Sequence, residues 1–418
     1  MVGFMSTARA TKFVAGRIFC SGLLAGLTLA AHPAGAVALH RPPPPMRVPA
    51  GKPDPDAALI AIYKDLAANN LQQAQLKADA LVLAYPDFSL GQLIRGDLLM
   101  MHGRPVNGLG SGSNGPADKL ADLREEALVR VKSLRERPDA ELIPRAILKL
   151  RDDQRFALVV DAKRSRLYVY EHLNGQLKLL SDYYITQGKL GTDKSREGDQ
   201  KTPVGVYYIT GRLARTRLPD FYGAGALPIN YPNEWDRVNG RSGSGIWLHG
   251  TPTGSFSRPP LASDGCVVLT NPDLEKLLGS VQPGKTPIVI SDRIEFTSRK
   301  VWKADRDAAD HLLDTWRRDL ESLDPARFIN NYSTHFKSAQ GEDVAGWLGK
   351  QQQAMPAVKE LDVKLLDVSI FTYPGRNDLI VSTFTQDATF SKRHHLIRKR
   401  QYWAKEGKAW KIVYEGNL

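Results

Sequence analysis

The sequence is poor in cysteine, with only Cys20 and Cys266 among its 418 residues. Two cysteines so far apart exclude the disulfide framework that holds small cysteine-rich domains together. The ligand patterns CxxC and HExxH of common zinc sites are also missing. We therefore expect neither a structural metal nor a cofactor.

The sequence also lacks an apolar run long enough to span a bilayer. The most prominent run, IFCSGLLAGLTLAA, has 14 residues, against the ~20 that a membrane helix needs. Arg9, Lys12 and Arg17 precede this run, and small residues up to Ala38 follow it, which is the pattern of a cleaved export signal. We predict that residues 1–38 are a signal peptide, that the mature protein has no transmembrane segment and that it is exported to the periplasm.

Lipidation of Cys20 is not expected. Arg17, Ile18 and Phe19 precede it, where a lipoprotein signal would need small residues. Cleavage after Ala36 or Ala38 would leave Cys266 as the single thiol and exclude an intrachain disulfide. A lone thiol in an oxidising compartment is open to oxidation and mispairing. Two interpretations of Cys266 therefore remain: a thiol with a functional reactivity, or a buried small apolar side chain.

Acidic residues are outnumbered, 45 against 57 Lys and Arg, which gives a formal charge of +12. Such an excess suits a polyanionic partner such as nucleic acid, anionic lipid or a cell-wall polymer. However, the sequence has no RNA-binding sheet motif, zinc finger or long arginine tract, and its basic residues are mixed with acidic ones. We therefore expect no nucleic-acid partner.

The mature chain divides into a linker and three parts. Residues 39–55 are rich in proline and predict a linker. Residues 56–150 carry apolar side chains at helical spacing and predict a helical module. Within it, Gly110, Gly112 and Gly115 have the spacing of a dinucleotide-binding fingerprint, but they follow a helical stretch rather than a strand, so we interpret them as a loop.

Short β-rich runs separated by Gly and Pro fill residues 155–291 and predict a mostly β domain. Residues 305–418 begin with a helical pattern, followed by predicted strands at 361–373, 378–390, 395–405 and 409–415. The sequence therefore predicts a multidomain α+β protein.

One cysteine and one histidine stand out in the β domain. His249 ends the apolar run GIWLH, and Cys266 begins the run CVVL 17 positions later. Two strand ends joined by a loop can bring an imidazole within hydrogen-bonding reach of a thiol, the pairing that nucleophilic cysteine chemistry needs. The Gly250 carbonyl can fix the imidazole tautomer, and the Gly265 and Cys266 N–H groups can form an oxyanion hole.

The order of the two residues argues against other cysteine enzymes. Papain-like hydrolases place the cysteine before the histidine, and caspase-like enzymes place the histidine about 50 residues upstream. Sortase-like transpeptidases also combine His and Cys, but the activating arginine that they need after the cysteine strand is not identifiable here.

The middle of the chain resembles the L,D-transpeptidase catalytic domain family. The resemblance includes LVVDAKRSRLYVYE, the TPxG turn at Thr202–Gly205 and the block IWLHGTPTGSFSRPPLASDGCVVL. Two positions depart from the commonest family pattern: Asp264 replaces a histidine, and Val268 replaces an arginine. This version is similar to a subgroup that includes cell-shape L,D-carboxypeptidases and enzymes that detach lipoproteins from the wall. In that subgroup a cone-like domain similar to nuclear transport factor 2 follows, as residues 305–418 suggest.

The resemblance implies that Cys266 attacks the L-centre carbonyl of diaminopimelate in a peptidoglycan stem peptide, with His249 as the base and D-alanine as the leaving group. An amine acceptor would give transpeptidation, water would give L,D-carboxypeptidase activity, and release of a wall-bound lipoprotein is a further alternative. Arg258 could bind the free stem carboxylate. Ser263 could bind substrate or shape the turn, and Asp264 should point away from a thiolate, towards the diaminopimelate amino group.

A scaffold that binds the wall without catalysis is the non-enzymatic alternative, and the retention of His249, Gly265 and Cys266 together argues against it. The sequence leaves open a homodimer or a protein partner bound through the helical or the C-terminal domain.

Overall fold

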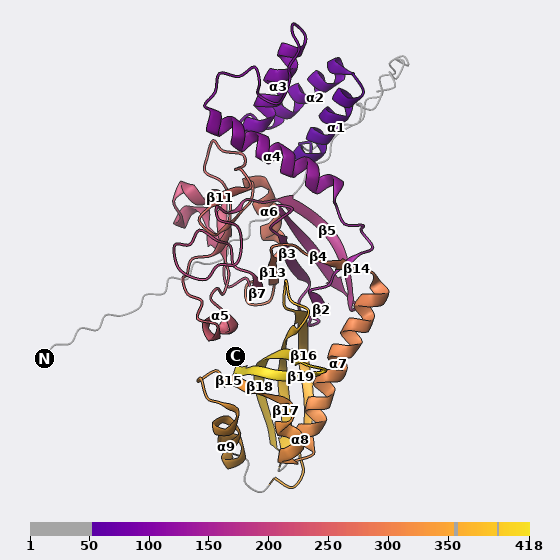
Figure 1. Ribbon diagram of the computed structural model, residues 1–418, viewed down its shortest axis with the longest axis vertical. Coiled ribbons are helices and arrows are strands. Elements are labelled where there is room, and N and C mark those ends of the chain that lie inside the picture. The colour runs from indigo at the N-terminus through magenta and orange to yellow at the C-terminus, as the bar shows by residue number, and fades with distance from the viewer. Residues whose placement is uncertain (1–51, 355–357, 391–392) are drawn as a thin grey trace, which may run out of the picture. The chain divides into compact units, whose positions relative to one another are not determined.

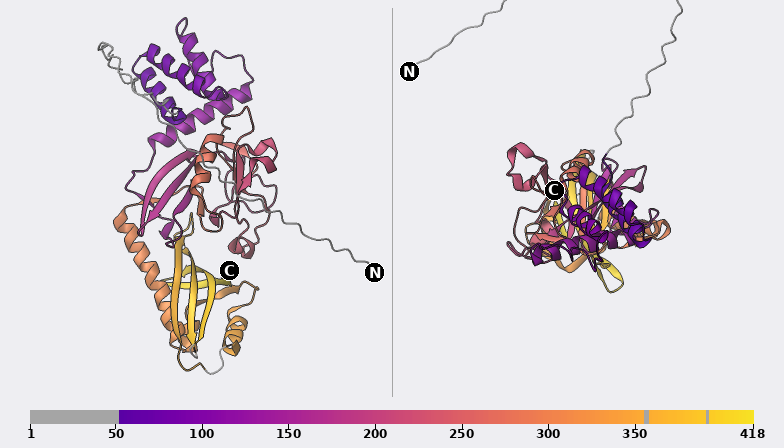
Figure 2. Two further views of the ribbon diagram at one scale, coloured as in Figure 1. Left: turned by 180° about the vertical axis from the view of Figure 1, so that it is seen from behind. Right: turned by 90° about the horizontal axis from the view of Figure 1, so that it is seen from above.

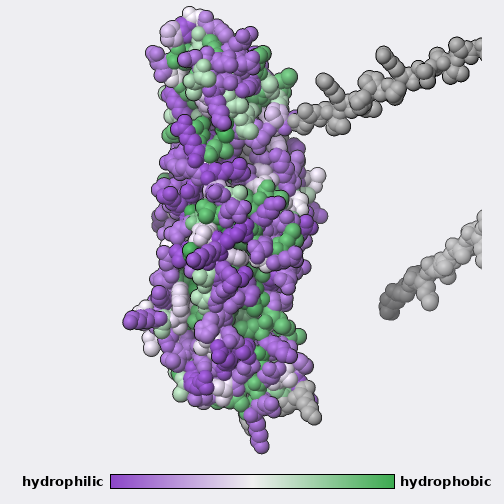
Figure 3. Space-filling model, turned by 90° about the vertical axis from the view of Figure 1, so that its right-hand side faces the viewer, coloured by the Kyte–Doolittle hydropathy of each residue, from purple (hydrophilic) through white to green (hydrophobic). Residues whose placement is uncertain are grey.

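The computed structural model describes residues 52–354, 358–390 and 393–418. The predicted signal peptide and most of the predicted linker, through residue 51, lie outside the described residues. Among the described residues, no helix combines the length and the apolar character that crossing a bilayer requires. Hydrophilic side chains cover most of the face that Figure 3 shows, and hydrophobic ones gather in smaller areas.

Four helices form the N-terminal module: α1 (Pro55–Ala67), α2 (Leu71–Ala84), α3 (Ser89–Met101) and α4 (Ala117–Arg135). Asp54 begins α1 by accepting the Ala57 N–H at 2.8 Å, and Pro55 occupies the first turn, where a missing N–H costs nothing. Apolar residues of all four helices pack into one core. The glycine-rich segment around Gly110 forms turns between α3 and α4.

The helical module is shorter than predicted. Its helices end at Arg135, and the following residues form β1 (Ile143–Pro144) and β2 (Ile147–Lys149). Strand β2 pairs with β16 (Asp362–Thr372) of the C-terminal sheet, more than 200 positions away. A short apolar run such as ILK takes its secondary structure from its partner, which the local pattern does not show.

The central domain is built on a five-stranded sheet in the order β5-β4-β3-β13-β7. The predicted hairpin forms β3 (Phe156–Asp161) and β4 (Arg166–Leu173), and β5 (Gln176–Tyr184) continues the meander. Strand β13 (Pro287–Ser291) lies parallel to β3, and β7 (Gly205–Tyr208) closes the edge. One face of this sheet contributes to a core that also contains side chains of helix α6 (Asn271–Ser280).

A second sheet, in the order β12-β10-β9-β8, carries the candidate nucleophile and base. Its strands are β8 (Leu213–Ala214), β9 (Gly225–Pro228), β10 (Trp247–His249) and β12 (Val267–Val268). Beside it, β6 (Gln187–Gly188) pairs with β11 (Leu261–Ser263), and η1 (Arg215–Arg217), η2 (Asp220–Tyr222) and α5 (Glu234–Val238) lie in the connections. Apolar side chains of β9, β10 and β12 enter the core shared with the five-stranded sheet.

The C-terminal domain follows β14 (Phe296–Thr297), which pairs with β1, and begins within the long helix α7 (Arg299–Glu321). Buried side chains of α7 recur at helical spacing, from Trp302 to Leu320, and the helix packs on β16 (Figures 1 and 2). The remaining elements are α8 (Pro325–Ile329), β15 (Tyr332–Ser338), α9 (Val344–Ala354), β17 (Leu379–Phe390), β18 (Arg393–Glu406) and β19 (Ala409–Asn417).

The six-stranded C-terminal sheet has the order β15-β19-β18-β17-β16-β2. Trp403 is fully buried among its core residues, and Trp410 packs against them. The predicted multidomain α+β class is confirmed, with N-terminal helices, a mostly β centre and a helix-plus-sheet C-terminal domain.

Leu248 tests how far the core under the second sheet supports the fold. Its side chain is fully buried at the centre of β10, so Leu248→Ala leaves a cavity and is expected to lower the free energy of unfolding by about 2–5 kcal/mol. Leu83→Ala is the control, because Leu83 is 86% exposed and its loss should cost under about 0.5 kcal/mol. Denaturant titration followed by tryptophan fluorescence measures both, and equal costs would contradict the packing described.

Candidate active site

The register between β10 and β12 places the candidate base and nucleophile on one face of the sheet. The strands are parallel, with Leu248 opposite Val267. Successive side chains of a strand point to opposite faces, and paired residues share a face. Leu248 and Val267 enter the core, so His249 and Cys266, each one position away, lie on the other face.

His249 is held as a neutral imidazole. Its side chain is buried, and Nδ1 lies 2.7 Å from the Gly250 carbonyl oxygen, which leaves Nε2 as the proton acceptor when Nδ1 carries the hydrogen. The rings of Tyr222 and Phe221 pack 5.1 and 5.6 Å from the imidazole. Burial, aided by the nearby charge of Arg258, lowers the pKa of His249 to about 4, so the imidazole can accept a proton at neutral pH.

Cys266 is partly exposed and protonated in the resting structure. Its thiol donates to the Gly245 carbonyl oxygen at 3.4 Å, and burial raises the pKa of the thiol above its usual range. Among the described residues, no hydrogen bond joins Cys266 Sγ to His249. The two side chains therefore share a face as a neutral pair, and the expected contact between them is not formed in the resting structure.

In the turn before the nucleophile, one of the two predicted oxyanion donors, the Gly265 N–H, already bonds to another group of the chain. Gly265 has φ +126°, a conformation that favours glycine, and its N–H donates to Ser263 Oγ at 3.1 Å. The Ser263 hydroxyl donates in turn to the Cys266 carbonyl oxygen at 2.6 Å. In this structure the Gly265 N–H is bonded to Ser263, and only the Cys266 N–H of the two is left without an acceptor among the described residues, so the oxyanion hole of both N–H groups stays a prediction. Of the two roles weighed for Ser263, these hydrogen bonds fit turn shaping, and substrate binding stays a prediction.

The TPxG turn contacts the residues before the nucleophile through hydrogen bonds of Thr202. Thr202 is fully buried, and its Oγ1 accepts the Gly188 N–H at 2.9 Å and donates to the Gly265 carbonyl oxygen at 3.0 Å. A Cβ on Gly265 would lie 2.7 Å from the Lys201 carbonyl oxygen, so a larger residue does not fit there. The motif was recognised in the sequence, but its contact with the loop was not.

Asp264 forms its hydrogen bonds with partners within the chain. It is 70% exposed and accepts hydrogen bonds from Lys189 at 2.9 Å and from Gln200 at 3.1 Å. The hydrogen bond from Lys189 holds the pKa of Asp264 below its usual value. Lys189 thus occupies the place that the sequence analysis gave to a substrate amino group. Val268, the second departure from the family pattern, is a buried strand residue.

Arg258 lies close enough to the site to affect its electrostatics. The guanidinium stands 4.6 Å from the centre of the Phe221 ring, and its charge lowers the pKa of His249 and of the Cys266 thiol. Within the described part of the chain, no carboxylate forms an ion pair with it. A half-buried cation beside the thiol is suited to receive an anionic group of a substrate.

Asn271 supports the histidine turn, a role that was not predicted from the sequence. Its side-chain amide donates to the Thr251 carbonyl oxygen at 2.8 Å and accepts the Ala224 N–H at 2.8 Å. A Cβ on Gly250 would come within 2.1 Å of Asn271 Oδ1, so this position requires glycine. The segment TNPD marks a helix start, but nothing in it indicates a contact with the His-Gly turn. Within the described residues, no group of three or more His, Cys, Asp or Glu side chains could hold a metal ion.

The protonation state of the thiol can be tested by alkylation. Because the pKa of Cys266 is raised and that of His249 is lowered, the resting pair is neutral, and the iodoacetamide rate should rise about tenfold per pH unit through neutrality. Cys266→Ala is the blank. A rate that is already constant from about pH 5 upwards would indicate a thiolate–imidazolium pair and would contradict this geometry.

Thr202 offers a second test. Thr202→Val keeps the shape but leaves the Gly188 N–H and the Gly265 carbonyl without their partner, so unfolding should become easier by about 1–3 kcal/mol. Thr202→Ser retains the hydroxyl and should recover most of this loss. Denaturant titration measures both variants. Equal stability of the valine variant and the parent would contradict the proposal that the two Thr202 hydrogen bonds stabilise the loop.

Two family models match this chain: the L,D-transpeptidase catalytic domain over residues 155–290, and the Cds6 C-terminal NTF2-like domain over residues 309–416. The Escherichia coli K12 protein YafK, provisionally named an L,D-transpeptidase, is 31% identical over 113 residues, which is 27% of this chain. The match spans 41% of the length of YafK.

Two solved structures are similar over about two thirds of the chain. Bd1075 of Bdellovibrio bacteriovorus has 28% identity and a TM-score of 0.59, covering 66% of this chain and 98% of that one. The helical cell shape determining protein Pgp2 of Campylobacter jejuni has 25% identity and a TM-score of 0.55, covering 68% and 98%. The predicted resemblance is confirmed: this chain carries an L,D-transpeptidase catalytic domain followed by an NTF2-like C-terminal domain.

Proposed function

We propose that this protein is an exported cysteine enzyme of peptidoglycan remodelling, of the L,D-transpeptidase type. The observation that carries the proposal is a neutral, buried His249 on the same sheet face as the protonated thiol of Cys266, within the matched catalytic domain. A base that is unprotonated at neutral pH, near a partly exposed thiol, can activate that thiol.

The first half-reaction acylates the enzyme. The thiol leaves the Gly245 carbonyl, turns towards His249 and transfers its proton to Nε2 as sulfur attacks the L-centre carbonyl of diaminopimelate. The Cys266 N–H has no acceptor among the described residues and can donate to the oxyanion. When the carbon–nitrogen bond breaks, the amine of D-alanine takes the proton from His249, and a thioester on Cys266 remains.

The second half-reaction depends on the acceptor. The amine of a neighbouring stem, losing its proton to His249, gives a crosslink and restores the thiol, which is transpeptidation. Water in the same position gives a carboxylic acid, so the enzyme would act as an L,D-carboxypeptidase. The similarity to Pgp2, a helical cell shape determining protein, favours this second candidate, because cell-shape L,D-carboxypeptidases belong to the resembled subgroup. Release of a wall-bound lipoprotein uses the same thioester.

Arg258 is the group proposed to bind the free carboxylate of the stem. Its guanidinium is half-buried and its charge reaches the thiol, and no carboxylate pairs with it in the described part of the chain. The planar guanidinium of an arginine can donate to both oxygens of a carboxylate at once, and this geometry suits a carboxylate better than the ammonium group of a lysine. The periplasm is the proposed location, since the stem peptide lies there and residues 1–38 have the pattern of an export signal.

Incubation with purified tetrapeptide muropeptides, followed by mass spectrometry, tests the function. The expected result is loss of one alanine, with a crosslinked dimer for a transpeptidase and without it for a carboxypeptidase. Cys266→Ala should abolish both products while unfolding as the parent does, because a partly exposed thiol contributes little packing.

Turnover by Cys266→Ala would disprove the mechanism. The non-enzymatic alternative, a scaffold that binds the wall, predicts no product from the parent protein and no mass increase on treatment with a carbapenem. If Cys266 is the nucleophile, the parent protein should release a product and should gain mass when treated with a carbapenem.

A further inference from the structure

The loop between His249 and Cys266 is anchored in the N-terminal helical module. Phe256 inserts into the core of that module, where its ring lies 4.8 Å from Tyr85 and 4.7 Å from Phe88. Its backbone N–H also faces the Asp87 carbonyl oxygen at 3.4 Å. The active-site loop therefore has one residue built into a different domain.

The next residue, Ser257, donates its hydroxyl to a buried carboxylate. Glu126 Oε1 on α4 accepts from Ser257 Oγ at 2.7 Å and from Arg130 Nε at 2.9 Å. The side chains of Glu126 and Arg130 are each only 2% exposed. A hydrogen bond to a charged group in such surroundings is stronger than one between neutral groups.

The same helix reaches the backbone of Arg258 by a second route. The Arg130 guanidinium lies 3.7 Å from the centre of the Tyr184 ring, and the Tyr184 hydroxyl donates to the Arg258 carbonyl oxygen at 2.9 Å. Thr186 Oγ1 donates to the same oxygen at 3.1 Å. The backbone of Arg258 is thus held on the side of the module, while its guanidinium stands over Phe221, the ring that packs on His249.

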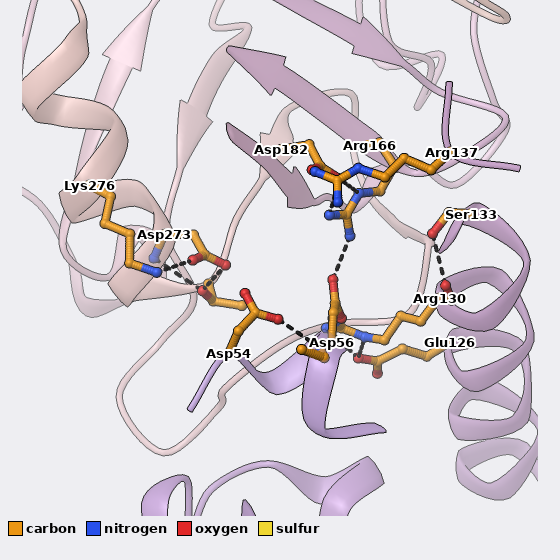
Figure 4. A network of polar contacts seen from close by, with 12 residues as sticks. Asp54, Asp56, Glu126, Arg130, Ser133, Arg137, Arg166, Asp182, Asp273 and Lys276 are labelled. Atoms are coloured by element: carbon orange, nitrogen blue, oxygen red, sulfur yellow. Dashed lines mark hydrogen bonds and ion pairs between the residues drawn. The ribbon is translucent and has the colours of Figure 1, made fainter. Parts of the chain in front are cut away.

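Figure 4 shows how α4 is fixed in turn. Arg130 pairs with Asp56 of α1, Asp56 pairs with Arg166 of β4, and Asp182 joins Arg166 to Arg137. These charges bridge the helical module and the five-stranded sheet. Removing one partner from such a buried set leaves the other charge uncompensated, so the arrangement permits little movement of α4.

We propose that the helical module positions Arg258 for an anionic substrate, with Ser257 and Glu126 as positioning residues that act through it. The contacts would then influence binding of a carboxylate, in addition to the effect of the Arg258 charge on the thiol pKa. The inference rests on the proposed function only in taking the free stem carboxylate as the natural ligand. The alternative is that the same contacts merely attach two domains.

Two alkylating reagents separate these possibilities without any peptidoglycan substrate. Iodoacetate is anionic and iodoacetamide is neutral, so the ratio of their rates with Cys266 reports the positive charge placed beside the thiol. Ser257→Ala should lower this ratio about fivefold, the effect of one lost hydrogen bond, and the ratio cancels any change in the thiolate fraction because that change affects both reagents equally. Arg258→Gln should lower the ratio at least as much, and Ser257→Ala should have no further effect in that background.

Ser133→Ala is the matched control. Ser133 is also a hydroxyl donor in the Arg130 region of α4, but it bonds within the helix, to the Arg130 carbonyl oxygen at 2.9 Å (Figure 4). Within the described residues, no hydrogen bond joins its hydroxyl to the loop. This variant should leave the reagent ratio unchanged. Ser257→Thr keeps a hydroxyl and should restore the ratio.

With tetrapeptide muropeptides, Ser257→Ala should raise KM about fivefold and leave kcat unchanged, as expected for a group that acts on substrate binding. An equal effect of Ser257→Ala and Ser133→Ala on the reagent ratio, or a ratio unaffected by Arg258→Gln, overturns the inference. If the parent protein releases no alanine, the proposed function fails, and the reagent ratio still decides the positioning of Arg258.

Discussion

The parallel pairing of β10 with β12 is the constraint on which the site depends. It sets Leu248 opposite Val267 in the core and thereby turns His249 and Cys266 to the opposite face. A slip of one residue would send either the imidazole or the thiol into the core, because side chains alternate along a strand. The 16 residues between them, which include β11, have contacts elsewhere, so the two functional groups owe their shared face to the sheet.

The electrostatics of the site favour a thiol at rest. Burial raises the pKa of Cys266 and lowers that of His249, so neither carries a charge at neutral pH. Burial raises the thiol pKa most, and the Asp264 charge adds to it; the backbone hydrogen bond of Trp247 and the charges of Arg258 and Lys194 lower the pKa by less. A protonated thiol is less easily oxidised than a thiolate, which suits a protein whose single mature thiol is proposed to reside in an oxidising compartment. Activation then has to accompany substrate binding.

Patterns local in the chain were predictable from the sequence. The hairpin of β3 and β4, the long C-terminal strands and the positions of His249 and Cys266 at strand ends all follow from alternating apolar residues and turn residues. The Gly265 donor was not predictable, since its use depends on the rotamer of Ser263. The departure of β2 from the predicted helical module follows from its pairing with a strand more than 200 residues later. The insertion of Phe256 into the core of the helical module was not predictable, because a single apolar residue in a loop does not indicate in the sequence which domain it packs against.

The central claim is that the sulfur of Cys266 carries the acyl group of the substrate. Its most direct test is to quench the parent protein with acid within the first turnover on a tetrapeptide muropeptide, and to map the adduct by intact-mass and peptide mass spectrometry. The account predicts a mass increase equal to the substrate minus D-alanine, located on the peptide that contains Cys266 and absent from Cys266→Ala. Release of D-alanine without any such adduct, or an adduct on another residue, would contradict it.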